Sequence, residues 1–382
     1  MKTLVFRPTD TWFFRESRPM EANNELQSVF PPPVRTLAGA VRSVIGEQMG
    51  VKWHLFKEKS TDPTCQALRQ LIGIGDDLGK LRLQGAWLVY ATERLYPTPL
   101  HLLKKENKII QLKLDKDTTH CDLGKYVRLT RLADSDRGAK SLENTWLTTK
   151  TLQAVLEGKT LTDYKTLLDT KALLQEEDLF KRESRLGIAH NYQTHAVQDR
   201  ALYQTQHIRP ERDTAVALDV EGLPNDFPAQ TMLRLGAEGR TASVECKPKT
   251  TQNLKQPVIK GRKFALYLLT PLHRENAPAN QPLPGFIPQT TGNSTYWEGK
   301  INGVSLKLLG AVSGKMQREG GWDMAKHEPR TVMNLIPAGS VFFCELAEGV
   351  KLDELKKLHL KQHGYMQQYG YGQMAVGVWN DQ

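Results

Sequence analysis

Residues 12–42, WFFRESRPMEANNELQSVFPPPVRTLAGAVR, join an aromatic strand end to a proline-led helix. The proline run 31–33 ends one element, and Pro33 suits the first turn of a helix, where its missing N–H would have no partner anyway. Apolar residues then recur at near-helical spacing from Val34 to Ile45. This stretch therefore predicts a strand over about residues 2–14 and a helix over residues 33–49.

Arginines accompany both of these elements. Arg15 and Arg18 follow the aromatic run, while Arg35 and Arg42 are seven residues apart and so project from nearly the same side of the helix. A basic strand edge beside a basic helix face could cradle a phosphate backbone. The alternative is a solvated helix face next to an ordinary loop.

Composition describes a globular chain with a basic balance. A length of 382 residues favours two domains, and 39% hydrophobic with 25% charged residues is ordinary for a soluble protein. We see neither a signal peptide nor an apolar run near the roughly 20 residues of a membrane helix, so we expect a cytoplasmic protein without a membrane partner. The net charge of +10 favours polyanionic partners such as nucleic acid, although subunits that meet acidic neighbours share this excess. The four cysteines form no CxxC pair, so we expect no disulfide framework, structural metal or cofactor: Cys65, Cys121, Cys246 and Cys344.

The pattern of elements favours an α+β protein with mainly antiparallel sheets. We expect strands over residues 81–90, 108–114 and 264–269, a helix over 146–156 capped by Thr148 or Thr149, and a helix or connecting arm over 161–180. In the tail we expect a strand at 340–345, a helix-like stretch at 351–360 and a last strand that ends at Trp379. Residues 50–80 resemble an insertion, residues 245–262 and 272–295 resemble exposed loops, and the domain boundary is placed near residue 185.

A glycine-rich segment, residues 363–379, precedes the C-terminus. Its glycines permit positive φ and close approach of a ligand, and its tyrosines could stack on bases. The segment has neither GxGxxG nor GK[ST], so it is no nucleotide-binding turn of those kinds. The alternative is a tight turn with tyrosines packed beneath it. The residues concerned are Gly364, Tyr365, Tyr369, Gly370, Tyr371, Gly372 and Gly377.

Two further stretches carry many basic residues without a catalytic signature. Residues 181–209 include Arg182 and Arg185 together with three histidines, whose spacing matches no HExxH site; we expect a strand–loop–strand unit that meets phosphate or an acidic partner. Residues 313–343 place a Gly-Gly-Trp-Asp loop tip on a basic segment. We find no two-carboxylate hydrolase pattern around Asp323, and no GxSxG elbow supports a Ser–His–Asp site, which the sequence alone leaves open.

The order of these segments resembles the RAMP superfamily of CRISPR–Cas systems, most closely the family of the third subunit of type III-B (Cmr) effector complexes, a Cas-five-like group. The resemblance is carried by DTWFFRESRPM (10–20), FPPPVRTLAGAVRS (30–43), ESRLGIAHNYQTHAVQDRALYQTQHIR (183–209) and the C-terminal series GWD, PAGSVFF and GYGQMAVGVW. GAWLV and LYPTPLHLL (85–103) resemble the intervening strand and proline loop. Residues 50–80 and 245–295 match nothing in this family pattern.

This resemblance implies two ferredoxin-like (RRM-related) βαββαβ domains with insertions, residues 1–185 and 186–382. It also implies a non-catalytic role: the subunit would hold the 5′ handle of CRISPR RNA and dock onto the large palm-domain subunit and a backbone RAMP subunit. The RNA contacts that it implies are Arg15, Arg18, Arg35, Arg42, Arg182, Arg185, Gly370, Tyr371 and Gly372.

Two other functions compete with this one. A CRISPR RNA-processing endoribonuclease would use His190, His195 or Tyr192 as acid or base near a ribose 2′-OH. A purely structural scaffold would contact proteins alone.

Overall fold

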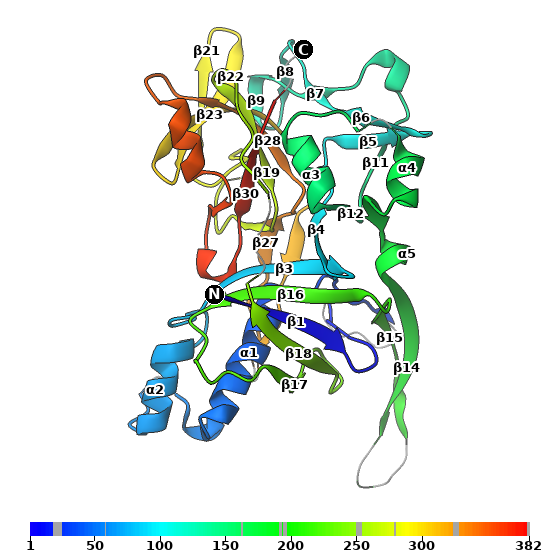
Figure 1. Ribbon diagram of the computed structural model, residues 1–382, viewed down its shortest axis with the longest axis vertical. Coiled ribbons are helices and arrows are strands. Elements are labelled where there is room, and N and C mark those ends of the chain that lie inside the picture. Colours follow the sequence, from blue (N-terminus) through cyan, green and yellow to red (C-terminus); the bar gives the residue numbers. More distant parts are fainter. Residues whose placement is uncertain are drawn as a thin grey trace.

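The computed structural model describes residues 1–17, 25–57, 59–161, 163–190, 193, 197–249, 254–278, 280–323 and 328–379. Within them the protein is α+β, with mostly antiparallel sheets and few helices, which confirms the predicted class. Two large sheets form the body, one above the other in Figure 1. None of the helices in these residues is long and apolar enough to cross a membrane.

The first large sheet has eight strands. Across the sheet these are β13 (Leu173–Gln175), β12 (Thr145–Thr148), β4 (Glu93–Pro97), β3 (Arg82–Tyr90), β16 (Thr214–Glu221), β1 (Lys2–Pro8), β18 (Thr241–Pro248) and β17 (Gln230–Arg234). Strand β16 is buried over seven of its eight residues because it lies between β3 and β1. Strands from both sides of residue 185 therefore share one sheet, and the domain boundary near residue 185 stays a prediction.

Helix α1 (Val34–Gln48) follows β1 and confirms the helix predicted from the proline-led stretch. Pro33 occupies the N-cap position, and the apolar side chains Leu37, Val41 and Ile45 are fully buried in the core beneath the sheet. The segment 50–80 folds into η1 (Trp53–Leu55) and α2 (Pro63–Ile72), whose Asp62 cap accepts a hydrogen bond from the Cys65 N–H. The predicted first strand is shorter than expected, since residues 9–14 leave the sheet after Pro8.

The second large sheet has nine strands. Eight follow in the order β29 (Lys361–Gln362), β30 (Gln373–Gly377), β19 (Lys263–Leu268), β28 (Val341–Leu346), β23 (Val304–Val312), β22 (Ser294–Ile301), β9 (Gly124–Val127) and β8 (Thr119–Cys121), and β21 (Ile287–Thr291) pairs with β22. The predicted strands at 264–269 and 340–345 are confirmed as β19 and β28. The exposed loop predicted over 272–295 is wrong at residues 287–291, which form β21. Residues 351–360 include the short helix η3 (Leu352–Lys357).

Smaller elements surround these sheets. They are β5 (Leu102–Lys105), β6 (Lys108–Gln111), β7 (Lys113–Leu114), β10 (Thr130–Arg131), η2 (Asp134–Asp136), β11 (Lys140–Ser141), α3 (Thr149–Leu156), α4 (Tyr164–Asp169), α5 (Glu176–Leu179), β20 (Leu272–His273), β24 (Gln317–Glu319), β25 (Trp322–Asp323), β26 (Glu328–Pro329), β27 (Met333–Ile336) and η4 (Gln367–Tyr369). Thr148 caps α3 as predicted, accepting from the Thr151 N–H, but Trp146 and Leu147 belong to strand β12 because they pair with β4 and β13.

A long hairpin projects from the body at the lower right of Figure 1. It consists of β14 (Phe180–His190) and β15 (Val197–Pro210), and the short strand β2 (Glu25–Leu26) joins β15 in parallel. The predicted strand–loop–strand unit is confirmed. Its strands carry exposed apolar side chains, among them Leu186, Ile188 and Leu202.

The strand order of both sheets has a common feature. The four central strands of the first sheet have the order β3-β16-β1-β18, and those of the second have the order β30-β19-β28-β23. In both sets of four, the strands that come first and third along the chain occupy the two middle positions. A βαββαβ unit would add two crossover helices to each sheet. Helix α1 lies in the connection from β1 to β3, and the short helix η3 lies in the connection from β28 to β30. The connection from β16 to β18 contains strand β17 where a helix would be expected. Two complete ferredoxin-like domains therefore stay a prediction.

Candidate nucleic-acid interface

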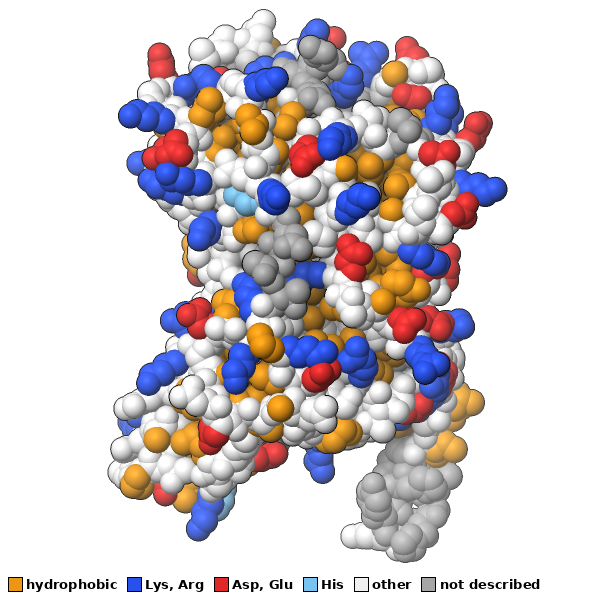
Figure 2. Space-filling model, in the orientation of Figure 1, with side chains coloured by type: hydrophobic (Ala, Val, Ile, Leu, Met, Phe, Trp, Pro, Cys, Tyr) orange, Lys and Arg blue, Asp and Glu red, His pale blue; other side chains and the backbone are white. Residues whose placement is uncertain are grey.

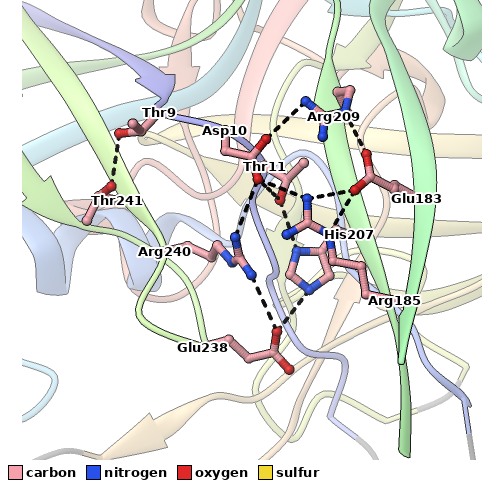
Figure 3. Close-up of polar contacts among 10 residues, drawn as sticks. All are labelled: Thr9, Asp10, Thr11, Glu183, Arg185, His207, Arg209, Glu238, Arg240 and Thr241. Carbon is pink, nitrogen blue, oxygen red and sulfur yellow. Dashed lines mark hydrogen bonds and ion pairs between the residues drawn. The ribbon is translucent and has the colours of Figure 1, made fainter. Parts of the chain in front are cut away.

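Three arginines converge on one carboxylate at the base of the hairpin (Figure 3). The Asp10 carboxylate lies 2.9 Å from Arg185, 3.1 Å from Arg209 and 3.5 Å from Arg240. Glu183 pairs with both Arg185 and Arg209 at 2.6 Å. We call this group, completed by His207 and Glu238, the hairpin-base cluster.

The register of the hairpin explains how this cluster forms. Glu183 lies opposite His207 and Arg185 opposite Thr205 in the β14–β15 ladder. Because alternate residues of a strand share a face, 183, 185, 207 and 209 all point toward the end of β1. The chain bends at Thr9 and Asp10 after β1 and so places Asp10 there, and the loop between β17 and β18 supplies the last two members, Glu238 and Arg240.

A buried histidine anchors the cluster. His207 is fully buried, with Nδ1 3.1 Å from Thr11 Oγ1 and Nε2 3.0 Å from Glu238, and its ring stacks on Phe13 at 5.1 Å. Burial lowers the pKa of His207. The neutral ring thus joins the segment after β1 to the hairpin without adding a charge.

Charges in the hairpin-base cluster balance, with three arginines against three carboxylates. The hydrogen bond from Arg185 lowers the pKa of Asp10, and the hydrogen bond from Arg209 lowers the pKa of Glu183, so both acids stay ionised. Arg209 nevertheless exposes 45% of its side chain. A phosphate could reach these guanidinium groups, which are already held in position, by displacing a carboxylate.

Helix α1 carries a second arginine group. Arg35 pairs with Asp76 at 2.6 Å, and Arg330 reaches the same carboxylate at 3.2 Å. Arg42 donates to the carbonyls of Gly75 and Gly73. We call these residues the α1 cluster. Arg35 exposes only 7% of its side chain and burial lowers the pKa of Arg42, so the predicted basic helix face is largely covered by loop 73–77.

Two more of the predicted arginines are placed apart from these groups. Arg182 points to the opposite face of β14 from Arg185, where it pairs with Glu176 at 2.7 Å and donates to the Ser28 carbonyl. Arg15 is exposed and forms an isolated bridge with Ser28. Arg18 lies outside the described residues.

The glycine-rich loop faces inward. Gly370 and Gly372 have φ of 90° and 72°, as their predicted role requires, but residues 369–377 are buried. The Gly370 carbonyl accepts from Thr270, and the Gly372 N–H donates to the Pro271 carbonyl. The backbone of Gly370 is closely approached, as predicted, but by strand β3. A methyl group added to Gly370 would lie 2.9 Å from the Leu83 carbonyl oxygen.

Tyr371 is likewise committed to the interior. It is 2% exposed, and its hydroxyl donates to Glu319 at 2.5 Å. The alternative role of the loop, a turn with tyrosines packed beneath it, describes these residues in this conformation. We therefore leave Gly370, Tyr371 and Gly372 out of the RNA surface proposed below.

The side chains of the candidate acid–base residues all fall outside the part of the chain that the structure describes. Tyr192 and His195 lie outside the described residues, and so does the side chain of His190. Across the described part of the chain, no group of three or more His, Cys, Asp or Glu residues is arranged to hold a metal ion.

Three arginines that converge here were absent from the predicted set: Arg209, Arg240 and Arg330. One signal was available in the sequence for Arg209. In a hairpin centred near residue 194, residue 209 falls on the same face as Arg185. Arg240 and Arg330 give no such signal, since their partners Asp10 and Asp76 are more than two hundred residues away.

Comparisons with known proteins agree with this organisation. The model of the family described as CRISPR-associated protein (Cas_Cmr3) matches residues 4–379. A chain from the cryo-EM structure of the type III-B Cmr-beta bound to cognate target RNA is similar over 98% of this chain and 96% of its own, with a TM-score of 0.52 and 14% identity. A chain from the same kind of complex with AMPPnP in state 1 gives a TM-score of 0.51 at 14% identity, over 98% of each chain. No curated protein gives a significant match.

At that identity the two solved structures show a shared fold. The family match spans almost the whole length, including the hairpin and both large sheets. This chain belongs to the CRISPR-associated protein (Cas_Cmr3) family.

Proposed function

We propose that the chain is a non-catalytic, RNA-binding subunit of a type III-B CRISPR effector, which holds the 5′ handle of CRISPR RNA and docks onto the large palm-domain subunit and a backbone RAMP subunit. The family match and the likeness to chains of an RNA-bound Cmr-beta complex support this assignment. The repeated central placement of first and third strands supports two elaborated ferredoxin-like domains.

The observation that carries the RNA-binding role is a band of arginines, in which residues 10–17 link the hairpin-base cluster to the α1 cluster. Asp10 begins this segment within the hairpin-base cluster. Ser17 ends it against Gly320, where a methyl group would lie 2.5 Å from Ser17 Oγ. The adjacent Gly321 carbonyl accepts from the N–H of Arg330, a member of the α1 cluster. Arg15 lies between the two clusters on this path.

The band can bind a polyanion because its guanidinium groups are already held in position. Figure 2 shows Lys, Arg, Asp and Glu side chains interspersed over the face that it presents. Along the band, by contrast, guanidinium groups are fixed by carboxylates and by backbone carbonyls. Fixed guanidinium groups lose less side-chain entropy when they bind phosphate, which favours RNA there.

We expect the double variant Arg185→Ala, Arg209→Ala to bind single-stranded RNA more weakly, with a salt slope lower by about 1.4, since each phosphate contact contributes about 0.7. Asp10→Asn should raise the affinity, because it removes the carboxylate that competes for the same arginines. Fluorescence anisotropy over a salt series measures both effects. Arg137→Ala is the matched control, since Arg137 is exposed and pairs with the equally exposed Asp134, away from both clusters.

This experiment also separates the competing functions. A scaffold that contacts proteins alone would show no salt-dependent binding of handle RNA. An endoribonuclease would cleave repeat RNA specifically, and would stop doing so on His190→Ala or His195→Ala. Intact RNA after incubation with the purified chain, with and without divalent metal, is the result we expect.

A further inference from the structure

A pocket of about 480 Å³ opens beside the small sheet formed by β11, β5 and β6. Its walls come from strands β5 and β11, the segment that leads into β12, and the first residue of helix α4. No member of either arginine cluster lines it. Pockets that hold small molecules typically measure roughly 300–1,000 Å³, so this one has room for a ligand.

Two lysines face each other in this pocket. Lys104 of β5 and Lys140 of β11 are direct partners in the antiparallel ladder, so their side chains leave the sheet on the same face, and both line the pocket. Like charges at directly opposite positions destabilise a sheet. Within the described part of the chain, neither ammonium forms an ion pair with a carboxylate. An anion bound between the two lysines would turn their repulsion into attraction.

One of the two lysines is already held in place. The Lys104 Nζ lies 3.8 Å from the centre of the Tyr164 ring, which is 5% exposed, so a cation–π interaction fixes this ammonium. A third lysine, Lys105, also lines the pocket, and its ammonium donates to the Ser135 carbonyl. A cation that is held before binding loses less side-chain entropy when an anion arrives.

The charges and the size of the pocket determine what fits there. A phosphate monoester carries a charge of about −1.5 to −2 at pH 7, which matches two ammonium groups. A phosphate group alone fills only a small part of the pocket, and the buried side chains of Leu142 and Tyr164 offer surface to a carbon skeleton. Glu106 and Glu143, which line the pocket and are exposed, repel a longer polyanion such as an RNA strand.

We infer that this pocket binds a small organic phosphate. The phosphate monoester lies between Lys104 and Lys140, and its organic part rests on Leu142. This inference goes beyond the proposed function, because the pocket shares no residue with the arginine band. Failure of either one leaves the other standing.

The test is isothermal titration calorimetry of the full chain at constant ionic strength, with ribose 5-phosphate, inorganic phosphate and ribose. The wild type should bind ribose 5-phosphate more tightly than inorganic phosphate, and should not bind ribose. Lys104→Gln and Lys140→Gln should each weaken ribose 5-phosphate binding on the order of ten-fold, since each removes a charged hydrogen-bond donor. Lys108→Gln is the matched control and should bind as the wild type does. Lys108 is an exposed lysine of the same small sheet, paired with Lys105 and outside the pocket lining.

Melting temperatures show whether the variants remain folded. Without ligand, Lys140→Gln should melt at or above the wild-type temperature, because it removes one of two opposed like charges. Ribose 5-phosphate should raise the melting temperature of the wild type and of Lys108→Gln more than that of Lys140→Gln.

Other outcomes would overturn the inference in distinguishable ways. A wild-type chain that binds neither phosphate compound, or folded Lys104 and Lys140 variants with wild-type affinity, would reject the site. Equal losses in Lys108→Gln would mean that binding reflects net charge alone. Tighter binding of a 5′-phosphorylated RNA oligonucleotide than of ribose 5-phosphate, lost in the same two variants, would assign the pocket to an RNA end in place of a small ligand.

Discussion

Between pH 4.5 and pH 7, wild-type protein should lose about 3 kcal/mol of stability relative to a Glu319→Gln variant. Glu319 is 8% exposed in strand β24, and burial raises the pKa of its carboxyl to about 7, from an ordinary 4.5. The protonated form is therefore the one that the folded state prefers. Its stabilisation is complete below pH 4.5 and is lost as the pH rises through 7, since the unfolded chain ionises first.

The surroundings of Glu319 explain why its pKa is raised and why the pKa is not raised further. Tyr371 donates a hydrogen bond to the carboxylate, and the charge of Arg35 lies near enough to lower the pKa, but burial is the larger effect. Tyr371→Phe removes the donor to the charged form and should move the pH-dependent loss to a higher pH. The hydroxyl itself stays protonated, because burial raises the pKa of Tyr371 well above its usual value.

Urea unfolding at several pH values between 4.5 and 8 measures this effect. Glu348→Gln, a substitution of the same chemistry at an exposed position, is the control and should follow the wild-type curve. Parallel pH profiles for wild type and Glu319→Gln would show that the carboxyl ionises normally in the folded protein, and would contradict the expectation.

Gly370→Ala should destabilise the protein by about 2–4 kcal/mol. About 1 kcal/mol comes from the backbone, because φ of 90° disfavours any side chain. A further 1–3 kcal/mol comes from sterics, since the new methyl group would lie 2.9 Å from the Leu83 carbonyl and 3.0 Å from Gln84 Cα. Both are backbone atoms of β3, which cannot rotate away as a side chain would.

Gly261→Ala is a matched control for this substitution. Gly261 has φ of 94° and no atom within 4 Å of the added methyl position, so it carries the backbone cost alone. The difference in unfolding free energy between the two variants reports the packing of the glycine-rich loop on β3. Equal free energies would mean that the loop moves aside easily, and that its burial contributes little to holding the two sheets together.

Residues that hold the fold together differ from residues that could contact RNA in how their variants should behave. Gly370 and Tyr371 join the C-terminal sheet to β3, and Arg35 lies close to the same buried pair. Loss of RNA binding in Gly370 or Tyr371 variants would therefore follow loss of structure. Loss of binding in Arg209 variants should leave the melting temperature unchanged, because the Arg209 side chain is 45% exposed.

The sequence by itself determined the local elements of this protein. Helix α1, the Thr148 cap, strands β3, β19 and β28 and the β14–β15 hairpin all follow from apolar spacing, capping residues and prolines within one short window. The positive φ at Gly370 and Gly372 is also a local property, which the glycine-rich segment itself indicates. The family resemblance was likewise carried by the order of short motifs, and the family match confirms it.

Only the tertiary structure decided what the functional side chains contact. Arg35 could not be distinguished from a solvated arginine until loop 73–77 placed Asp76 against it, and Gly370 could not be distinguished from a ligand-facing glycine until β3 filled the space in front of it. Arg240 joined Asp10 from 230 residues away in the chain, across β1, β17 and β18. Ion pairs and close packing depend on which distant segments become neighbours, and residue spacing along the chain carries little information about that.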